Sequence, residues 1–149
     1  MGAVASGGIP VLNRQEVRFV SDNQIEETTR RVRREVERQE VLYRKGRPAR
    51  RLTGQSVILV DDGAATGATM RAAISAVRAQ QPARLVVALP IAPPETCASL
   101  AKSVDELICL IVPKVFFSVG QWYDDFSPCT DDEVCELLDG LENPVEVGT

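Results

Sequence analysis

Histidine is absent from this chain of 149 residues, and cysteine and aromatic residues are scarce. Without histidine, neither the Ser-His-Asp nor the Cys-His form of nucleophilic catalysis is available. The four cysteines, at positions 97, 109, 129 and 135, form no Cys-x-x-Cys pair, so a zinc site would need four scattered thiolates. We therefore expect free, mostly buried thiols, as in proteins of a reducing compartment.

Long apolar runs and a strong net charge are also missing. No stretch approaches the roughly 18 to 20 apolar residues that span a bilayer, and the N-terminus lacks the pattern of a secretion signal. The net charge of -4 argues mildly against a general nucleic-acid binder. These absences predict a cytoplasmic protein that binds neither membranes nor nucleic acid. The balance of 44% apolar and 26% charged residues is typical of a folded chain, and the length favours one domain, residues 1–149.

The pattern of apolar residues predicts alternating helices and strands. Residues 2–13 are predicted to form a hairpin with a glycine turn, and residues 22–43 a long amphipathic helix that leads into a basic loop. Further strands are expected at 56–60, 83–92 and 106–113, with a fourth extended segment at 114–126, and further helices at 68–80, 95–104 and 130–140. This alternation is typical of an α/β fold with a largely parallel sheet.

Two local details sharpen these expectations. The continuous β-branched run at 56–60 predicts a strand that is covered on both faces. In the last helix, Thr130 is expected to be the N-cap, with Glu133 completing a capping box and Gly140 lying beyond the helix end.

The sequence VILVDDGAATGAT, residues 57–69, carries most of the chemical information. Asp61 and Asp62 follow a strand, and ligands of open α/β sheets bind beyond the carboxyl ends of strands. The loop of small residues leads into a helix, whose N-terminal amide groups attract phosphate, and Thr66 and Thr69 can add hydroxyl donors. The two carboxylates would repel a phosphate but accept hydrogen bonds from the vicinal hydroxyls of a ribose. The pattern fits a ribose 5-phosphate; a strand that ends in a polar turn with a capping threonine fits the spacing about as well.

These thirteen residues resemble the phosphoribosyl-pyrophosphate motif of the type I phosphoribosyltransferases: an apolar strand, two acidic residues, a short loop and TGxT. The wider chain, from GAVASGG to DDF, is similar to small stand-alone phosphoribosyltransferases of bacteria. The resemblance implies a mostly parallel sheet flanked by helices, with Asp61 and Asp62 holding the ribose 2- and 3-hydroxyls. It also implies that the 5-phosphate is wrapped by Ala64, Ala65, Thr66, Gly67, Ala68 and Thr69.

A second resemblance lies in FFSVGQWYDDF, residues 116–126, which is similar to a segment of purine-type members. It implies that Phe117 stacks on a base, that Ser118 offers backbone groups, and that Asp124 reaches the magnesium-pyrophosphate. Mg²⁺ would then arrive with the substrate instead of occupying a dedicated site. The alternative is that the aromatic residues of this segment simply pack the C-terminal end of the domain.

Two departures from the family pattern stand out. Members that act on 6-oxopurines carry an aspartate just before the TG, where this chain has Ala65, so that proton-handling role has no matching residue. The family's first strand, pyrophosphate loop and second strand have no counterpart ahead of residue 2. We therefore expect a chain that is truncated at its N-terminus relative to the family, or a sheet completed by a partner segment.

The resemblance implies transfer of phosphoribose from 5-phosphoribosyl 1-pyrophosphate to a nitrogen base. We hypothesise that Arg47, Arg50 and Arg51 of the basic loop cover the pyrophosphate; a solvated surface loop is the alternative. The other class of function is a non-catalytic regulatory module that binds phosphoribosyl pyrophosphate or a nucleotide, or an incomplete enzyme fragment. The thin apolar stripe of the helix at 22–43 and an exposed sheet edge predict a homodimer.

Overall fold

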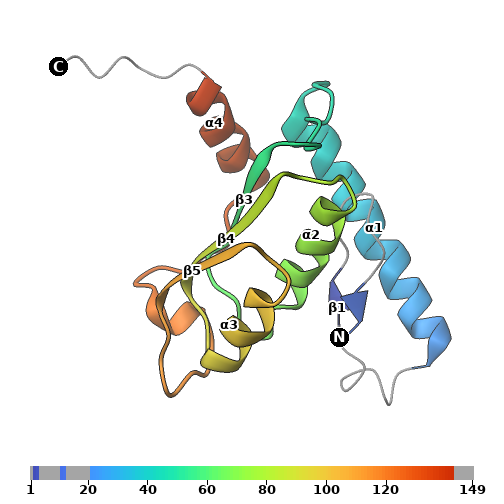
Figure 1. Cartoon of the computed structure of the whole chain (residues 1–149). Coiled ribbons are helices and arrows are strands. Elements are labelled where there is room, and N and C mark those ends of the chain that lie inside the picture. The colour runs from blue at the N-terminus through green and yellow to red at the C-terminus, as the bar shows by residue number, and fades with distance from the viewer. Residues whose placement is uncertain (1, 4–10, 13–20, 143–149) are drawn as a thin grey trace.

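The computed structural model describes residues 2–3, 11–12 and 21–142. The elements, in chain order, are β1 (Gly2–Ala3), β2 (Val11–Leu12), α1 (Asp22–Arg44), β3 (Ser56–Val60), α2 (Ala68–Arg78), β4 (Arg84–Ile91), α3 (Pro94–Ala101), β5 (Glu106–Ile111), the 3-10 helix η1 (Gly120–Trp122) and α4 (Asp131–Glu142) (Figure 1). β1 and β2 pair antiparallel, as expected of a hairpin. The predicted glycine turn between them lies outside the described residues.

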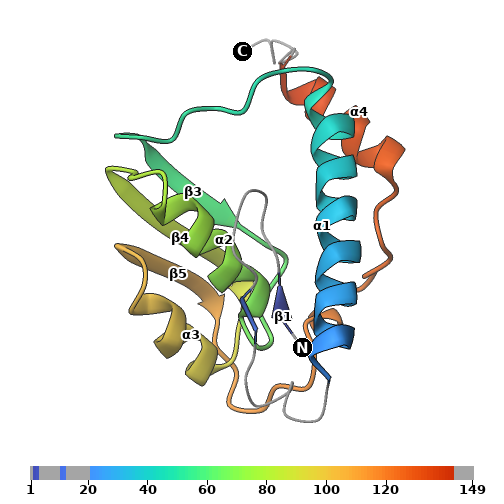
Figure 2. The same cartoon turned by 90° about the vertical axis from the view of Figure 1, so that its right-hand side faces the viewer.

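A three-stranded parallel sheet in the order β3-β4-β5 forms the centre of the fold. β4 lies in the middle, and its side chains alternate between the two faces. Leu85, Val87 and Leu89 on one face pack with apolar side chains of both α2 and α3, so these two helices cover the same face (Figure 2). Met70, Ile74 and Val77 of α2 are buried there, together with Leu100 of α3. The α/β fold predicted from the sequence is confirmed.

The opposite face of the sheet is open to solvent along its two edge strands, β3 and β5, although Val86 of β4 is buried on it, and this corrects one expectation. Strand β3 is not covered on both faces, because Ile58 and Val60 are 63% and 72% exposed, and Leu110 of β5 is 78% exposed. These side chains alternate with partly buried ones along their strands, so they point away from α2 and α3. The β-branched run at 56–60 therefore indicates a strand, but this strand belongs to a sheet that helices cover on one face.

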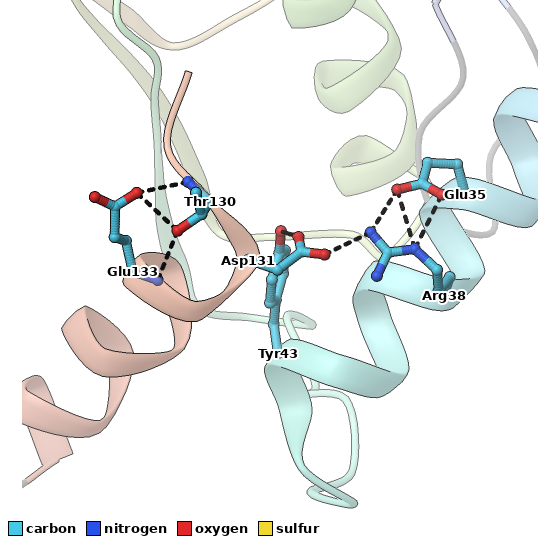
Figure 3. Close-up of polar contacts among 6 residues, drawn as sticks. All are labelled: Glu35, Arg38, Tyr43, Thr130, Asp131 and Glu133. Carbon is cyan, nitrogen blue, oxygen red and sulfur yellow. Dashed lines mark hydrogen bonds and ion pairs between the residues drawn. The ribbon is translucent and has the colours of Figure 1, made fainter. Parts of the chain in front are cut away.

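Helix α1 is held by polar contacts instead of apolar burial. It begins at a capping box in which the Gln24 amide donates to Ser21 Oγ at 3.4 Å, and the Ser21 amide donates to Gln24 Oε1 at 3.2 Å. None of its 23 residues is buried. Its C-terminal half lies beside α4, where the Tyr43 hydroxyl donates to Asp131 at 2.6 Å and Arg38 pairs with Asp131 at 2.8 Å (Figure 3).

Helix α4 confirms its predicted start and corrects its predicted end. The Glu133 amide donates to Thr130 Oγ1 at 3.3 Å, and the Thr130 amide donates to Glu133 Oε2 at 2.7 Å, which is the expected capping box (Figure 3). The helix runs to Glu142, so Gly140 lies inside it. A glycine costs a helix about 1 kcal/mol relative to alanine, which is too little to end it by itself.

Residues 114–126 do not form the fourth extended segment that was expected. They contain the 3-10 helix η1, in which the Trp122 amide donates to the Val119 carbonyl at 3.0 Å. The segment turns back on itself because Gly120 lets the Phe126 ring pack against its backbone. The four cysteines are free, as predicted, but Cys129 is exposed and the other three are only half-buried. Within the described parts of the chain, no helix is long and apolar enough to cross a bilayer.

Candidate functional site

The two aspartates of the motif lie where the sequence placed them, at the carboxyl end of β3. Asp61 is half-buried and Asp62 is exposed. The Asp62 amide donates a hydrogen bond to Asp61 Oδ1 at 3.0 Å. Burial raises the pKa of Asp61 above its ordinary value, the negative charge of Asp62 adds to this, and the amide hydrogen bond opposes it. The pair thus offers carboxylate oxygens to the solvent side of the loop, at some cost in desolvation.

The backbone of the loop between β3 and α2 is anchored by three neighbouring segments. The Tyr123 hydroxyl donates to the Asp62 carbonyl oxygen at 2.5 Å. The Ala64 amide donates to the Ile91 carbonyl at the end of β4, at 3.0 Å. The hydroxyl of Thr96, a buried residue of α3, donates to the Ala65 carbonyl at 2.7 Å. These contacts fix successive peptide groups of the loop from the protein side.

Glycine is required at two positions of this loop for different reasons. A side chain at Gly63 would collide with Val119, since a Cβ there would lie 2.7 Å from its Cγ1 atom. Gly67 has a φ of +70°, in the left-handed region that residues with a Cβ rarely adopt. The same glycine is the N-cap of α2.

The outward side of the loop is suited to an anion. Ala65, Thr66 and Thr69 are exposed, so their side chains are available to a ligand. Gly67 provides no side-chain hydrogen bond to the first turn of α2. Among the described residues, no side chain caps the N–H groups of that turn, and the positive end of the helix dipole lies behind them.

The segment that follows β5 reaches the same end of the sheet as the motif. Tyr123 contacts the Asp62 carbonyl, and Val119 packs against Gly63. Phe117 is 83% exposed, so it does not pack the C-terminal end of the domain as the alternative required. Ser118 and Asp124 of this segment are exposed as well. Tyr123 and Val119 had no recognisable signal in the sequence, because their role depends on a turn that brings residues 119–126 onto the loop.

The basic loop lies away from the aspartates. Residues 45–55 lead into the start of β3, whereas Asp61 follows its end, and five strand residues span about 17 Å (Figure 1). Arg47 donates from Nε to the Arg44 carbonyl at 2.9 Å and so binds the C-terminal end of α1. Arg47 and Arg50 line a cavity of about 470 Å³ between α1 and Leu138 of α4. The structure therefore does not bring Arg47, Arg50 and Arg51 together with Asp61 and Asp62, against the hypothesis that they cover a pyrophosphate.

Comparison with known proteins identifies the family to which this chain belongs. Residues 3–126 match the family model described as the phosphoribosyl transferase domain. The chain belongs to the phosphoribosyl transferase family. A protein named provisionally as a phosphoribosyl transferase, present in two strains of Mycobacterium tuberculosis, is 39% identical over 140 residues, which are 93% of this chain and 32% of that protein. The chain thus spans about a third of the length of these curated relatives.

A solved structure supports the same assignment of this phosphoribosyl transferase domain. Protein TT1426 of Thermus thermophilus is 39% identical and superposes with a TM-score of 0.71. The match covers 91% of this chain and 64% of TT1426. The resemblance of residues 57–69 to the family motif is therefore confirmed as family membership.

Proposed function

We propose that this domain binds 5-phosphoribosyl 1-pyrophosphate at residues 61–69 and transfers its phosphoribose to a nitrogen base. The observation that carries the proposal is the joint placement of two carboxylates and an uncapped helix N-terminus on one loop. A diol and a phosphate are the two groups that such a loop recognises, and ribose 5-phosphate carries both. Membership of the phosphoribosyl transferase family supports the same substrate class.

The loop would hold the sugar through complementary groups. Asp61 and Asp62, when ionised, accept hydrogen bonds from the ribose hydroxyls. The phosphate is bound by N–H groups of the first turn of α2 and by the hydroxyls of Thr66 and Thr69. Residues 64–69 thus wrap the 5-phosphate, while the anchors on the Asp62 and Ala65 carbonyls keep the loop in one conformation.

In the reaction, the bond between C1 of the ribose and the pyrophosphate oxygen breaks, and a bond from C1 to the base nitrogen forms. The transition state resembles an oxocarbenium ion, so the protein acts mainly by positioning the two reactants. Phe117 offers an exposed aromatic face to the base, and Ser118 offers backbone groups beside it.

The exposed carboxylate of Asp124 fits magnesium that is brought by the substrate. Among the residues that the structure describes, no group of three or more His, Cys, Asp or Glu side chains could hold a metal ion. Mg²⁺ would be held chiefly by pyrophosphate oxygens and water, with the Asp124 carboxylate as one further ligand, direct or through water. Bound there, it would neutralise the charge of the leaving group.

Titration calorimetry with ribose 5-phosphate and with 5-phosphoribosyl 1-pyrophosphate tests the binding site. We expect both to bind the wild type, and Asp61→Asn together with Asp62→Asn to weaken binding at least tenfold. Asp132→Asn, which removes an exposed carboxylate on α4, serves as the matched control and should bind as the wild type does. A wild type that binds neither ligand would refute the proposal.

A second assay tests transfer. Release of pyrophosphate is measured with the donor, Mg²⁺ and a panel of purine and pyrimidine bases. Release that depends on one base supports the transferase. Binding without release from any base would instead assign the domain to the regulatory modules. The predicted homodimer and cytoplasmic location stay predictions, and sedimentation measures the former.

A further inference from the structure

We infer that Tyr123 is a positioning residue for the donor site: its hydroxyl sets the orientation of the Asp62–Gly63 peptide and so of the loop that binds the ribose. The inference rests on the function proposed above. It assigns a role to a residue that lies 61 positions beyond Asp62 in the sequence and is outside the binding motif.

The position of the Tyr123 ring is itself fixed by packing. The centroids of the Tyr123 and Phe126 rings lie 5.2 Å apart, with an angle of 37° between the planes. The Phe126 ring rests on Gly120, where a Cβ would approach its Cδ1 atom to 2.9 Å. The Tyr123 amide also donates to the Gly120 carbonyl at 3.3 Å. Gly120, Tyr123 and Phe126 thus form a compact unit, which presents one hydroxyl to the loop.

Holding one carbonyl oxygen constrains more than one atom. The peptide between Asp62 and Gly63 is planar and trans, so its carbonyl and its N–H point in opposite directions. A fixed Asp62 carbonyl therefore also fixes the direction of the Gly63 N–H. Val119 packs against the Cα of Gly63, which follows this peptide, because its methyl groups leave no room for a side chain at Gly63.

The segment from 117 to 126 then joins the two halves of the proposed site. It carries Phe117 and Asp124, which are proposed to meet the base and the magnesium-pyrophosphate, and it holds the loop that is proposed to meet the ribose. The hydrogen bond from the Tyr123 hydroxyl to the Asp62 carbonyl links this segment to the loop. Loss of that hydroxyl should loosen the donor loop while the ring continues to pack against Phe126.

The chain contains its own matched control, since it has two tyrosines and each donates a short hydrogen bond. Tyr123→Phe removes the bond to Asp62, whereas Tyr43→Phe removes a bond of 2.6 Å to Asp131 between α1 and α4 (Figure 3). We expect Tyr123→Phe to bind ribose 5-phosphate about three- to tenfold more weakly than the wild type, as befits one hydrogen bond. Tyr43→Phe should bind within about twofold of the wild type, although both variants lose a comparable amount of stability in urea.

Amide hydrogen exchange provides a readout that requires no ligand. In Tyr123→Phe, we expect the amide of Ala64 to exchange several-fold faster, and in Tyr43→Phe to exchange at the wild-type rate. Equal ribose 5-phosphate affinity in the wild type and Tyr123→Phe would overturn the inference and leave the proposed function intact. If the wild type does not bind ribose 5-phosphate, the proposed function fails, and unchanged exchange at Ala64 would then overturn the positioning role independently.

Discussion

Replacing Gly63 by alanine tests whether the loop is as tightly enclosed as its contacts indicate. The added Cβ would lie 2.7 Å from Cγ1 of Val119 and 3.0 Å from Cγ2 of Ile91, closer than packed carbon atoms approach. The backbone cannot simply retreat, because the Ala64 amide is bonded to the Ile91 carbonyl and the Asp62 carbonyl is bonded to Tyr123. The conformation of Gly63 has a negative φ, so the test is one of space and not of backbone strain.

Overpacking of this kind costs about 1 to 3 kcal/mol. In a domain of this size, each kcal/mol lowers the melting temperature by roughly 2 to 4 °C. We therefore expect Gly63→Ala to melt about 2 to 12 °C below the wild type in thermal unfolding followed by circular dichroism. Ribose 5-phosphate should also bind more weakly, since the displaced peptide joins Asp62 to residues 64–69, which are proposed to bind the phosphate.

Two further variants make the outcome decisive. Adding Val119→Ala to Gly63→Ala removes the two colliding methyl groups of Val119, including the nearest one, so the double variant should be more stable than Gly63→Ala alone. Gly140→Ala is the control, because nothing lies within 4 Å of a Cβ at this site inside α4, and it should stabilise the domain by about 0.5 to 1 kcal/mol. A Gly63→Ala protein as stable as the wild type, or a double variant that recovers nothing, would refute the reasoning.

Three other predictions concern charge. Burial raises the pKa of Asp61, so the folded protein holds that proton more tightly than the unfolded chain does. The ionised carboxylate therefore lowers the stability of the fold above its folded pKa and has no such effect below about pH 3. Asp61→Asn should raise the melting temperature at pH 7, leave it unchanged at pH 3, and abolish tight ribose 5-phosphate binding. The hydrogen bond from Tyr43 lowers the pKa of Asp131. The stability that the ionised Asp131 contributes to the fold is therefore complete above its unfolded pKa and is lost as the pH falls through its folded pKa. Urea unfolding at a series of pH values should show this loss of stability, and Tyr43→Phe should make the loss smaller. The double variant Arg50→Ala, Arg51→Ala should bind 5-phosphoribosyl 1-pyrophosphate within about twofold of the wild type at physiological salt, where charges beyond roughly 8 Å are screened. A tenfold loss of affinity in calorimetry would instead show that the basic loop contributes to binding of the pyrophosphate.

The order of elements and the place of the motif could be predicted from the sequence, because both depend on local patterns. The apolar run at 56–60 and the spacing of Met70, Ile74 and Val77 are sufficient to indicate a strand followed by a helix. Asp61 lies at the carboxyl end of that strand by connectivity alone. The capping box at Thr130 is likewise a local feature, and it was found correctly.

What the sequence did not yield depends on long-range contact. Ile58 and Val60 belong to a β-branched run that suits a covered strand, yet which faces are covered depends on where the helices lie. The aromatic residues of 116–126 read as a strand, because nothing local shows that Phe126 folds back onto Gly120. The bond from Tyr123 to Asp62 joins positions 61 residues apart, and no spacing rule reaches that far.

The way the loop at residues 61–69 is restrained has a consequence for redesign. Its shape is set by main-chain anchors and by two glycines, while the side chains of Ala65, Thr66 and Thr69 face solvent and carry none of those restraints. If the proposed function holds, substitutions at these three positions should change which phosphorylated sugar is bound without unfolding the domain. A library confined to them would explore ligand preference on a constant scaffold.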